Sequence, residues 1–218
     1  MFLFETRIYP LTDARLSGLS HAEQVVRLSD GGAKLIQLRE KNLTPGEFFK
    51  QAEAALLIAR QRGVRIVIND RVDIALALEA DGVHLGQEDF PPEAARRLLG
   101  DGAIIGVSTH NVEQARRAAK LPVNYLAIGP IFATSSKQNC EPLLGLDGLR
   151  QVRDATGNFP IVAIGGISQE NALEVLESGA DALAVISALL AQPDEVSERT
   201  KRLLAQALNA HKKRDKQI

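Results

Sequence analysis

Aromatic residues and cysteine are scarce in this chain of 218 residues. It has no tryptophan, aromatic residues make up 4% of it, and Cys140 is its single cysteine. One cysteine excludes an internal disulfide and a cysteine-rich structural zinc site, and we expect its thiol to have no catalytic role. With so few aromatic rings, the core must be built mainly from alanine, leucine, isoleucine and valine. These residues are typical of the interior of α/β barrels.

The sequence also lacks an excess of charge of either sign and a long apolar run. Its 26 basic and 27 acidic residues leave a net charge of −1, so no overall field attracts nucleic acid or an anionic membrane. No apolar run approaches the roughly 20 residues of a membrane span, and residues 1–10 are too short and too polar for a signal peptide. We therefore expect a soluble, cytoplasmic protein that attracts anionic small molecules only locally. Homo-oligomerisation is left open.

Short apolar runs alternate with longer amphipathic segments along the whole chain. The runs are rich in isoleucine, valine and leucine and lack strict alternation, as do strands buried on both faces of a parallel sheet. The length suits a (β/α)8 barrel, which needs about 200–250 residues, whereas an open flavodoxin-like sheet rarely needs so many strand–helix units. We therefore predict a single α/β domain, a (β/α)8 TIM barrel over residues 1–211. The expected strands are 7–11, 34–38, 65–68, 82–85, 104–107, 125–128, 161–164 and 183–186.

Residues that favour helix N-termini precede several of the segments between these strands. Thr44 is followed by a proline and, three residues on, by Glu47, which together predict a capping box. Asn111 and Ser168 are expected to cap helices as well. The basic run over residues 212–218 is expected to be a disordered tail outside the barrel. The predicted helices are 45–62, 112–119, 170–177 and 193–211.

Polar residues directly follow several of the predicted strands. In (β/α)8 enzymes the active site lies where the strands meet their following loops, and polar groups beside buried strands cost free energy unless something pairs with them. Two lysines and an arginine at one mouth could hold a multiply charged phosphate, although loop lysines are ordinarily solvent-exposed. The cationic and hydrogen-bonding set is Gln37, Arg39, Lys41, Ser108 and Lys137.

Two carboxylates, Asp70 and Asp89, end neighbouring strand–loop units. Mg²⁺ is usually held by one or two carboxylates together with substrate oxygens and water, so a magnesium site beside the phosphate cluster is one interpretation. The others are a salt bridge from Asp70 to Arg71 or Arg39, and a helix cap from Asp89.

A second anion site is expected on the far side of the mouth. Gly165 and Gly166 lead towards the helix expected after Ser168, and Ile186 and Ser187 lead into another helix. Backbone N–H groups at helix N-termini bind phosphate, and barrels often build such a site after strands seven and eight. Two anion sites on one mouth imply two phosphorylated substrates or one long one.

Two histidines lie near the same mouth. His84 falls within the fourth predicted strand, and we expect it to point into the barrel with a satisfied hydrogen bond. His110 follows the fifth strand and could perform acid–base chemistry. No nucleophile stands beside either of them in the sequence.

The motifs that contain these residues resemble those of the thiamin-phosphate synthase family, in the family order, from about Tyr9 to Leu190. Ser136 stands where the family usually has a second threonine, which keeps the hydroxyl and loses a methyl group. The matching segments are 37–41 (QLREK), 68–71 (INDR), 82–89 (GVHLGQED), 129–132 (GPIF) with Thr134, Ser136 and Lys137, 164–167 (IGGI) and 185–188 (VISA).

The resemblance implies a Mg²⁺-dependent transferase. The family condenses 4-amino-2-methyl-5-(diphosphooxymethyl)pyrimidine with a thiazole phosphate, giving thiamin phosphate and pyrophosphate. Arg39, Lys41 and Lys137 would then act electrostatically, and Asp70 and Asp89 would bind Mg²⁺. The residues implied for the pyrimidine diphosphate are Gln37, Arg39, Lys41, Asn69, Ser108 and Lys137, and those for the thiazole phosphate are Thr134, Ser136, Gly166, Ile186 and Ser187.

Three alternative functions remain at this stage. Thiazole tautomerases are similar to this family and share its phosphate end, and His110 could supply the proton transfer that such an isomerase needs. A non-catalytic barrel that binds thiazole phosphate would leave Asp70 and Asp89 without a purpose. Another phosphate-binding barrel from amino-acid biosynthesis would share Gly165 and Gly166 but would not account for residues 37–41.

Overall fold

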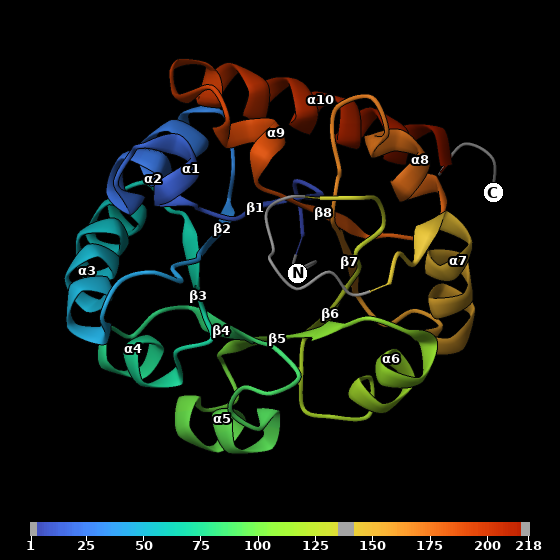
Figure 1. Cartoon of the computed structure of the whole chain (residues 1–218), viewed down its shortest axis with the longest axis horizontal. Coiled ribbons are helices and arrows are strands. Elements are labelled where there is room, and N and C mark those ends of the chain that lie inside the picture. Colours follow the sequence, from blue (N-terminus) through green and yellow to red (C-terminus); the bar gives the residue numbers. More distant parts are fainter. Residues whose placement is uncertain (1–3, 135–141, 215–218) are drawn as a thin grey trace.

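The computed structural model describes residues 4–134 and 142–214. Their strands form one parallel sheet that curves into a ring, and the helices surround it (Figure 1). Each strand is three to six residues long and almost entirely buried, as the apolar runs predict. The strands are β1 Ile8–Pro10, β2 Leu35–Leu38, β3 Arg65–Asn69, β4 Gly82–Leu85, β5 Ile104–Thr109, β6 Tyr125–Ile128, β7 Ile161–Ile164 and β8 Ala182–Val185.

The strand order confirms the (β/α)8 barrel and excludes an open flavodoxin-like sheet. Neighbouring strands pair in the order β1-β8-β7-β6-β5-β4-β3-β2. The ring is completed between β1 and β2, where Leu11 bridges Gln37 in parallel and the Thr12 N–H donates to the Gln37 carbonyl at 2.9 Å. All strands therefore point the same way, and their carboxyl-terminal ends meet at one mouth.

The helices lie on the outside of the ring in Figure 1, with α10 running past α8, α9 and α2. Within the described chain, no helix is long and apolar enough to cross a membrane. The helices are α1 Ala14–Ser17, α2 His21–Asp30, α3 Pro45–Gln61, α4 Val72–Ala77, α5 Pro92–Leu99, α6 Val112–Ala118, α7 Gly145–Thr156, α8 Ala172–Glu177, α9 Ser187–Leu190 and α10 Val196–Arg214, with a 3-10 turn at Pro193–Glu195.

Capping chemistry explains where several of these helices begin. The Thr44–Glu47 capping box and the Asn111 cap are confirmed, since each side chain accepts a backbone N–H of its first turn. The expected Ser168 cap is wrong, because α8 begins only at Ala172. The Ser168 hydroxyl donates to Glu170 instead, and the Asn171 side chain accepts the Ser168 N–H at 2.8 Å.

The end of α10 also differs from expectation. The helix continues to Arg214, so residues 212–214 of the expected tail are helical. Residues 215–218 lie outside the described part of the chain. The continued helix is consistent with the sequence of residues 212–214, two lysines and one arginine, which are good helix formers.

Two apolar layers hold the barrel together, one on each face of the sheet. The larger layer packs one set of strand side chains against the helices, for example Ile36, Leu126 and Leu183. The opposite side chains of the strands fill the inside of the ring. Both tyrosines of the chain, Tyr9 and Tyr125, lie in this inner layer and are fully buried.

We expect Gly82→Ala to destabilise the barrel. Gly82 pairs with Ile104, and a Cβ at Gly82 would lie 1.9 Å from the Ile104 carbonyl oxygen, which is backbone and cannot rotate away. The expected loss in the free energy of unfolding is about 1–3 kcal/mol, measured by denaturant unfolding. Gly102→Ala is the matched control, because a Cβ there meets no atom within 4 Å, and it should change stability by less than about 0.5 kcal/mol. Equal stabilities of the two variants would contradict the steric argument.

Candidate active site at the barrel mouth

A pocket of about 760 Å³ occupies the mouth formed by the carboxyl-terminal ends of the strands. Ser136, Lys137 and Cys140 fall outside the described residues, and the other predicted site residues all line this one pocket. Their assigned roles remain predictions, but the fold brings them together. The lining includes Gln37, Arg39, Lys41, Asn69, Asp70, Asp89, Ser108, Thr134, Gly166, Ile186 and Ser187, and also His84 and His110.

Asp70 and Asp89 form a pair of neighbouring carboxylates. Asp70 follows β3 with a left-handed backbone (φ 63°), and its N–H donates to the His84 carbonyl at 2.8 Å. The Asp89 Oδ2 accepts the Gly86 N–H at 2.6 Å. Burial raises the pKa of Asp89, and the Asp70 carboxyl beside it raises this pKa further. The two negative charges therefore repel each other in a partly desolvated place, which a bound cation would relieve.

The ion pair of Asp70 differs from those expected from the sequence. Asp70 forms an ion pair with Lys41, whereas Arg71 forms one with Asp73. Arg39 pairs with Asp13, with 3.3 Å between guanidinium and carboxylate. The salt bridges that sequence analysis offered for Asp70 therefore go to other partners.

Asp89 does not cap the helix that follows it. Helix α5 begins after Pro91, with no side-chain capping hydrogen bond. The described residues contain no group of three or more histidine, cysteine or acidic side chains that could hold a metal. A cation at this site would rely on the Asp70–Asp89 pair, ligand oxygens and water, which is the donor set that Mg²⁺ favours.

The loop after β2, which carries Arg39 and Lys41, is held by a buried carboxylate that sequence analysis did not single out. The Glu40 side chain accepts the Lys41 N–H at 2.7 Å and lies 3.4 Å from the ring nitrogen of the buried His21. Burial alone would raise the pKa of Glu40, but backbone hydrogen bonds and His21 lower it overall. The Thr12 hydroxyl joins this anchor, since it contacts His21 at 2.7 Å and accepts the Arg39 N–H at 3.1 Å. The two cationic side chains therefore start from a fixed backbone.

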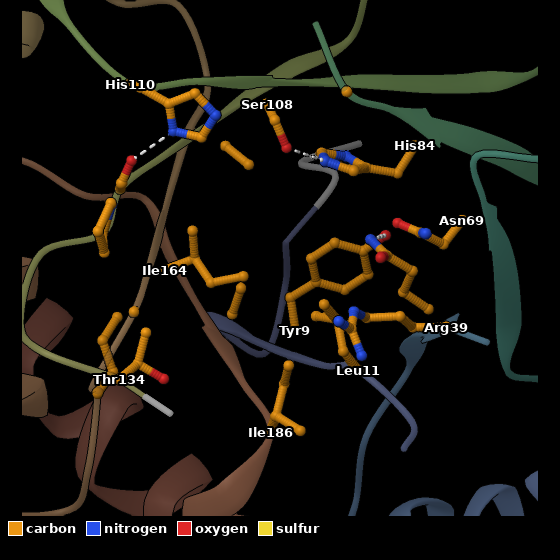
Figure 2. A pocket seen from close by; sticks show the side chains of 18 of the residues that line it. Tyr9, Leu11, Arg39, Asn69, His84, Ser108, His110, Thr134, Ile164 and Ile186 are labelled. Atoms are coloured by element: carbon orange, nitrogen blue, oxygen red, sulfur yellow. Dashed lines mark hydrogen bonds between the residues drawn. The ribbon is translucent and has the colours of Figure 1, made fainter. Parts of the chain in front are cut away.

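Two buried amides on the pocket lining keep unused hydrogen-bonding capacity. Gln37 donates through Nε2 to Tyr9 Oη at 3.1 Å, while its Oε1 has no partner among the described residues. Asn69 Nδ2 is also buried without a partner in that part of the chain. Figure 2 shows Tyr9, Asn69 and His84 directed into the same pocket. An unpaired buried donor and acceptor are costly, so they favour a polar ligand that satisfies both.

His84 points into the barrel, as the sequence predicts, and both ring nitrogens are engaged. Nδ1 lies 2.9 Å from Tyr125 Oη, and Nε2 lies 2.9 Å from Ser108 Oγ. The His84–Ser108 contact is visible in Figure 2. Tyr125 was not among the residues expected at the site, although a tyrosine that begins an otherwise aliphatic strand is a signal that could have identified it.

His110 is oriented by two hydrogen bonds of its own. Its Nδ1 lies 2.7 Å from the Gly129 carbonyl, so that nitrogen carries a proton, and its backbone N–H donates to Gln114 at 2.7 Å. The imidazole therefore ties the end of β5 to the end of β6. His110 also lines the pocket, where an acid–base role would be possible. That role stays a prediction.

Thr134 lies across the pocket from Asn69 (Figure 2), and the lining also includes Ala133, Gly165 and Gly166. Gly166 has a left-handed backbone (φ 62°), and a Cβ there would lie 2.6 Å from the Ala133 carbonyl oxygen. Both features require glycine. The helix expected to start at Ser168 begins only at Ala172, whereas α9 does begin at Ser187. A phosphate near Gly166 would thus meet loop N–H groups rather than a helix end.

Known proteins resemble this chain over nearly its whole length. The family model described as "Thiamine monophosphate synthase" matches residues 8–189. The thiamine-phosphate synthase of Chloroflexus aurantiacus is 44% identical over 204 residues, which is 93% of each chain. That of Albidiferax ferrireducens is 50% identical over 189 residues, 86% of each chain. The structure of thiamine phosphate pyrophosphorylase from Pyrococcus furiosus is similar with a TM-score of 0.85 and 37% identity, covering 96% of this chain and 99% of that one. The chain therefore belongs to the thiamine monophosphate synthase family of transferase enzymes.

Proposed function

We propose that this protein condenses 4-amino-2-methyl-5-(diphosphooxymethyl)pyrimidine with a thiazole phosphate, forming thiamin phosphate and pyrophosphate. The observation that carries the proposal is the composition of one pocket. Neighbouring carboxylates and Lys41 lie on one side of it, unpaired amide groups of Gln37 and Asn69 lie on its lining, and glycine-rich backbone lies opposite. A diphosphate, a heteroaromatic ring with donors and acceptors, and a second phosphate would each meet matching chemistry.

Asp70 and Asp89 would hold Mg²⁺. When bound, the ion would neutralise charge that grows on the leaving diphosphate. The fit rests on the proximity of the two carboxylates, which burial and mutual repulsion make receptive to a cation. Lys41, which forms the ion pair with Asp70, would then be available to a diphosphate oxygen.

The protein's own groups would bind and orient rather than attack. Arg39 and Lys41, on the loop anchored by Glu40, would hold the diphosphate, and Lys137 would add a third positive charge. Ser108 would donate to the same anion. The bond to the diphosphate breaks at a carbon attached to an electron-rich aminopyrimidine, which stabilises the resulting cation, and the thiazole nitrogen then forms the new bond. No protein nucleophile is required.

The thiazole phosphate would lie opposite, against Thr134, Gly166, Ile186 and Ser187, and Ser136 would add a hydroxyl. The left-handed Gly166 brings backbone close to the pocket without a side chain in the way. N–H groups of that loop and of the start of α9 would supply the hydrogen bonds that a phosphate needs.

We expect thiamin phosphate and pyrophosphate to form only when both phosphorylated substrates and Mg²⁺ are present. The measurement is an end-point assay by chromatography, with magnesium replaced by a chelator in the control. A second arm offers the enzyme a thiazole phosphate isomer alone. Isomerisation without condensation would favour the tautomerase, and binding without either reaction would favour a non-catalytic barrel.

We expect Asp70→Asn to lower kcat/KM by about 100-fold or more at limiting Mg²⁺, because one of two anionic ligands is lost. The fold should persist, since asparagine tolerates the left-handed backbone at this position. Asp73→Asn is the matched control. Its carboxylate is largely exposed and pairs with Arg71, and the variant should stay within about twofold of wild type. Wild-type activity of Asp70→Asn at limiting Mg²⁺ would remove the metal assignment.

We expect Asn69→Leu to weaken binding of the pyrimidine diphosphate by about 10- to 100-fold with no loss of stability. The substitution removes a buried donor that is unpaired without ligand. Calorimetry and thermal unfolding measure the two effects. Asn124→Leu is the control with the opposite pattern, because Asn124 precedes β6 at the other end of the barrel and accepts the Ile105 N–H at 2.8 Å. The Asn124→Leu variant should lose stability and retain binding. If Asn69→Leu also lost stability and retained binding, the role of Asn69 would be structural.

A further inference from the structure

Tyr125 reaches His84 although β5 lies between their strands. Gly106 on β5 is in register with both residues, on β4 and β6 respectively. A Cβ at Gly106 would lie 2.0 Å from Tyr125 Cζ. The tyrosine ring therefore occupies the space that a side chain at position 106 would need. The His84 and Tyr125 rings stack at 22° with centroids 5.5 Å apart. The glycine thus permits a direct contact between alternate strands.

This contact is one link in a chain of hydrogen bonds across the barrel interior. Gln37 Nε2 lies 3.1 Å from Tyr9 Oη, and Tyr9 Oη lies 2.9 Å from Tyr125 Oη. Tyr125 Oη is 2.9 Å from His84 Nδ1, and His84 Nε2 is 2.9 Å from Ser108 Oγ. This series of hydrogen bonds therefore connects Gln37 to Ser108, two side chains predicted to bind ligand.

Each phenol keeps its proton and has to donate it. Burial raises the pKa of Tyr9 and also that of Tyr125. Tyr9 Oη already accepts from the Gln37 amide, so its proton goes to its other neighbour, Tyr125 Oη. Tyr125 then has His84 Nδ1 as the acceptor for its own proton. With the Gln37 amide as the donor at one end, every buried hydroxyl can donate only if the hydrogen bonds run from Gln37 towards Ser108, and a hydroxyl that does not donate costs free energy.

We propose that Tyr125 is a positioning residue that holds His84 as the Nε2–H tautomer. His84 then donates to Ser108 Oγ, and the Ser108 hydroxyl proton is directed to the pocket as a donor. The hydrogen bonds could run the opposite way only if the Gln37 amide presented Oε1 to Tyr9. In that case Ser108 would donate to His84 instead. The part of this inference that concerns catalysis rests on the proposed function, whereas the tautomer does not.

NMR of the histidine ring nitrogens in the unliganded full-length protein tests the tautomer. The chain has four histidines, and His84→Asn identifies the His84 signals by their absence. At about pH 8, where an ordinary histidine is neutral, wild type should show Nε2–H. Tyr125→Phe removes only the hydroxyl and should allow the Nδ1–H form to appear. Nδ1–H in wild type, or an unchanged tautomer in Tyr125→Phe, overturns the proposal.

Tyr9→Phe is the matched control for the NMR experiment. It removes the other buried phenol hydroxyl and leaves Tyr125 able to donate to His84. The His84 tautomer should therefore stay Nε2–H. A change as large as that in Tyr125→Phe would mean that disturbance of the barrel interior, and not the Tyr125 proton, sets the tautomer.

Kinetics tests whether the tautomer matters for the reaction. Tyr125→Phe should lower kcat/KM for the pyrimidine diphosphate about two- to tenfold, the loss of one neutral hydrogen bond. In a Ser108→Ala background the same change should have no further effect, because the two residues act in series. Independent, multiplicative losses overturn the coupling. If wild type shows Nε2–H but no condensation, the proposed function fails and the tautomer assignment stands.

Discussion

The barrel closes where Leu11 bridges Gln37 and Thr12 bonds to the Gln37 carbonyl. This junction joins the first strand to the second and converts a row of parallel strands into a ring. Because of it, residues from β2 and β3 face residues from β6, β7 and β8 across one mouth. Thr12 extends the junction to the site itself, since its hydroxyl accepts the Arg39 N–H and contacts His21.

Unbalanced polar groups concentrate at that mouth. Asp70 and Asp89 repel each other, and Gln37 and Asn69 keep a buried acceptor and donor without partners in the described chain. Below them, two apolar layers cover both faces of the sheet. A folded protein tolerates such local cost when a ligand removes it. The pocket therefore favours a ligand that carries both charge and hydrogen-bonding groups, as the proposed substrates do.

Much of this architecture could be predicted from the sequence, because it depends on local patterns. Continuous apolar runs such as 125–128 and 161–164 became β6 and β7 with the predicted bounds, and Thr44 and Asn111 cap the expected helices. The predicted helix cap at Ser168 is wrong, and its hydroxyl donates to Glu170 instead. Capping preferences alone do not distinguish these two hydrogen bonds. The magnesium dependence and the cytoplasmic location remain predictions.

Strand–helix alternation, polar residues placed after strands, and the family can all be recognised in the amino-acid sequence. These follow from periodicity and from motifs whose order along the chain is fixed. The contacts between distant residues become apparent only in the folded barrel: Lys41 with Asp70, Glu40 with His21, and Tyr125 with His84 past Gly106. The physical reason is that such contacts depend on barrel closure and on the register between strands, which bring together residues that lie far apart in the sequence.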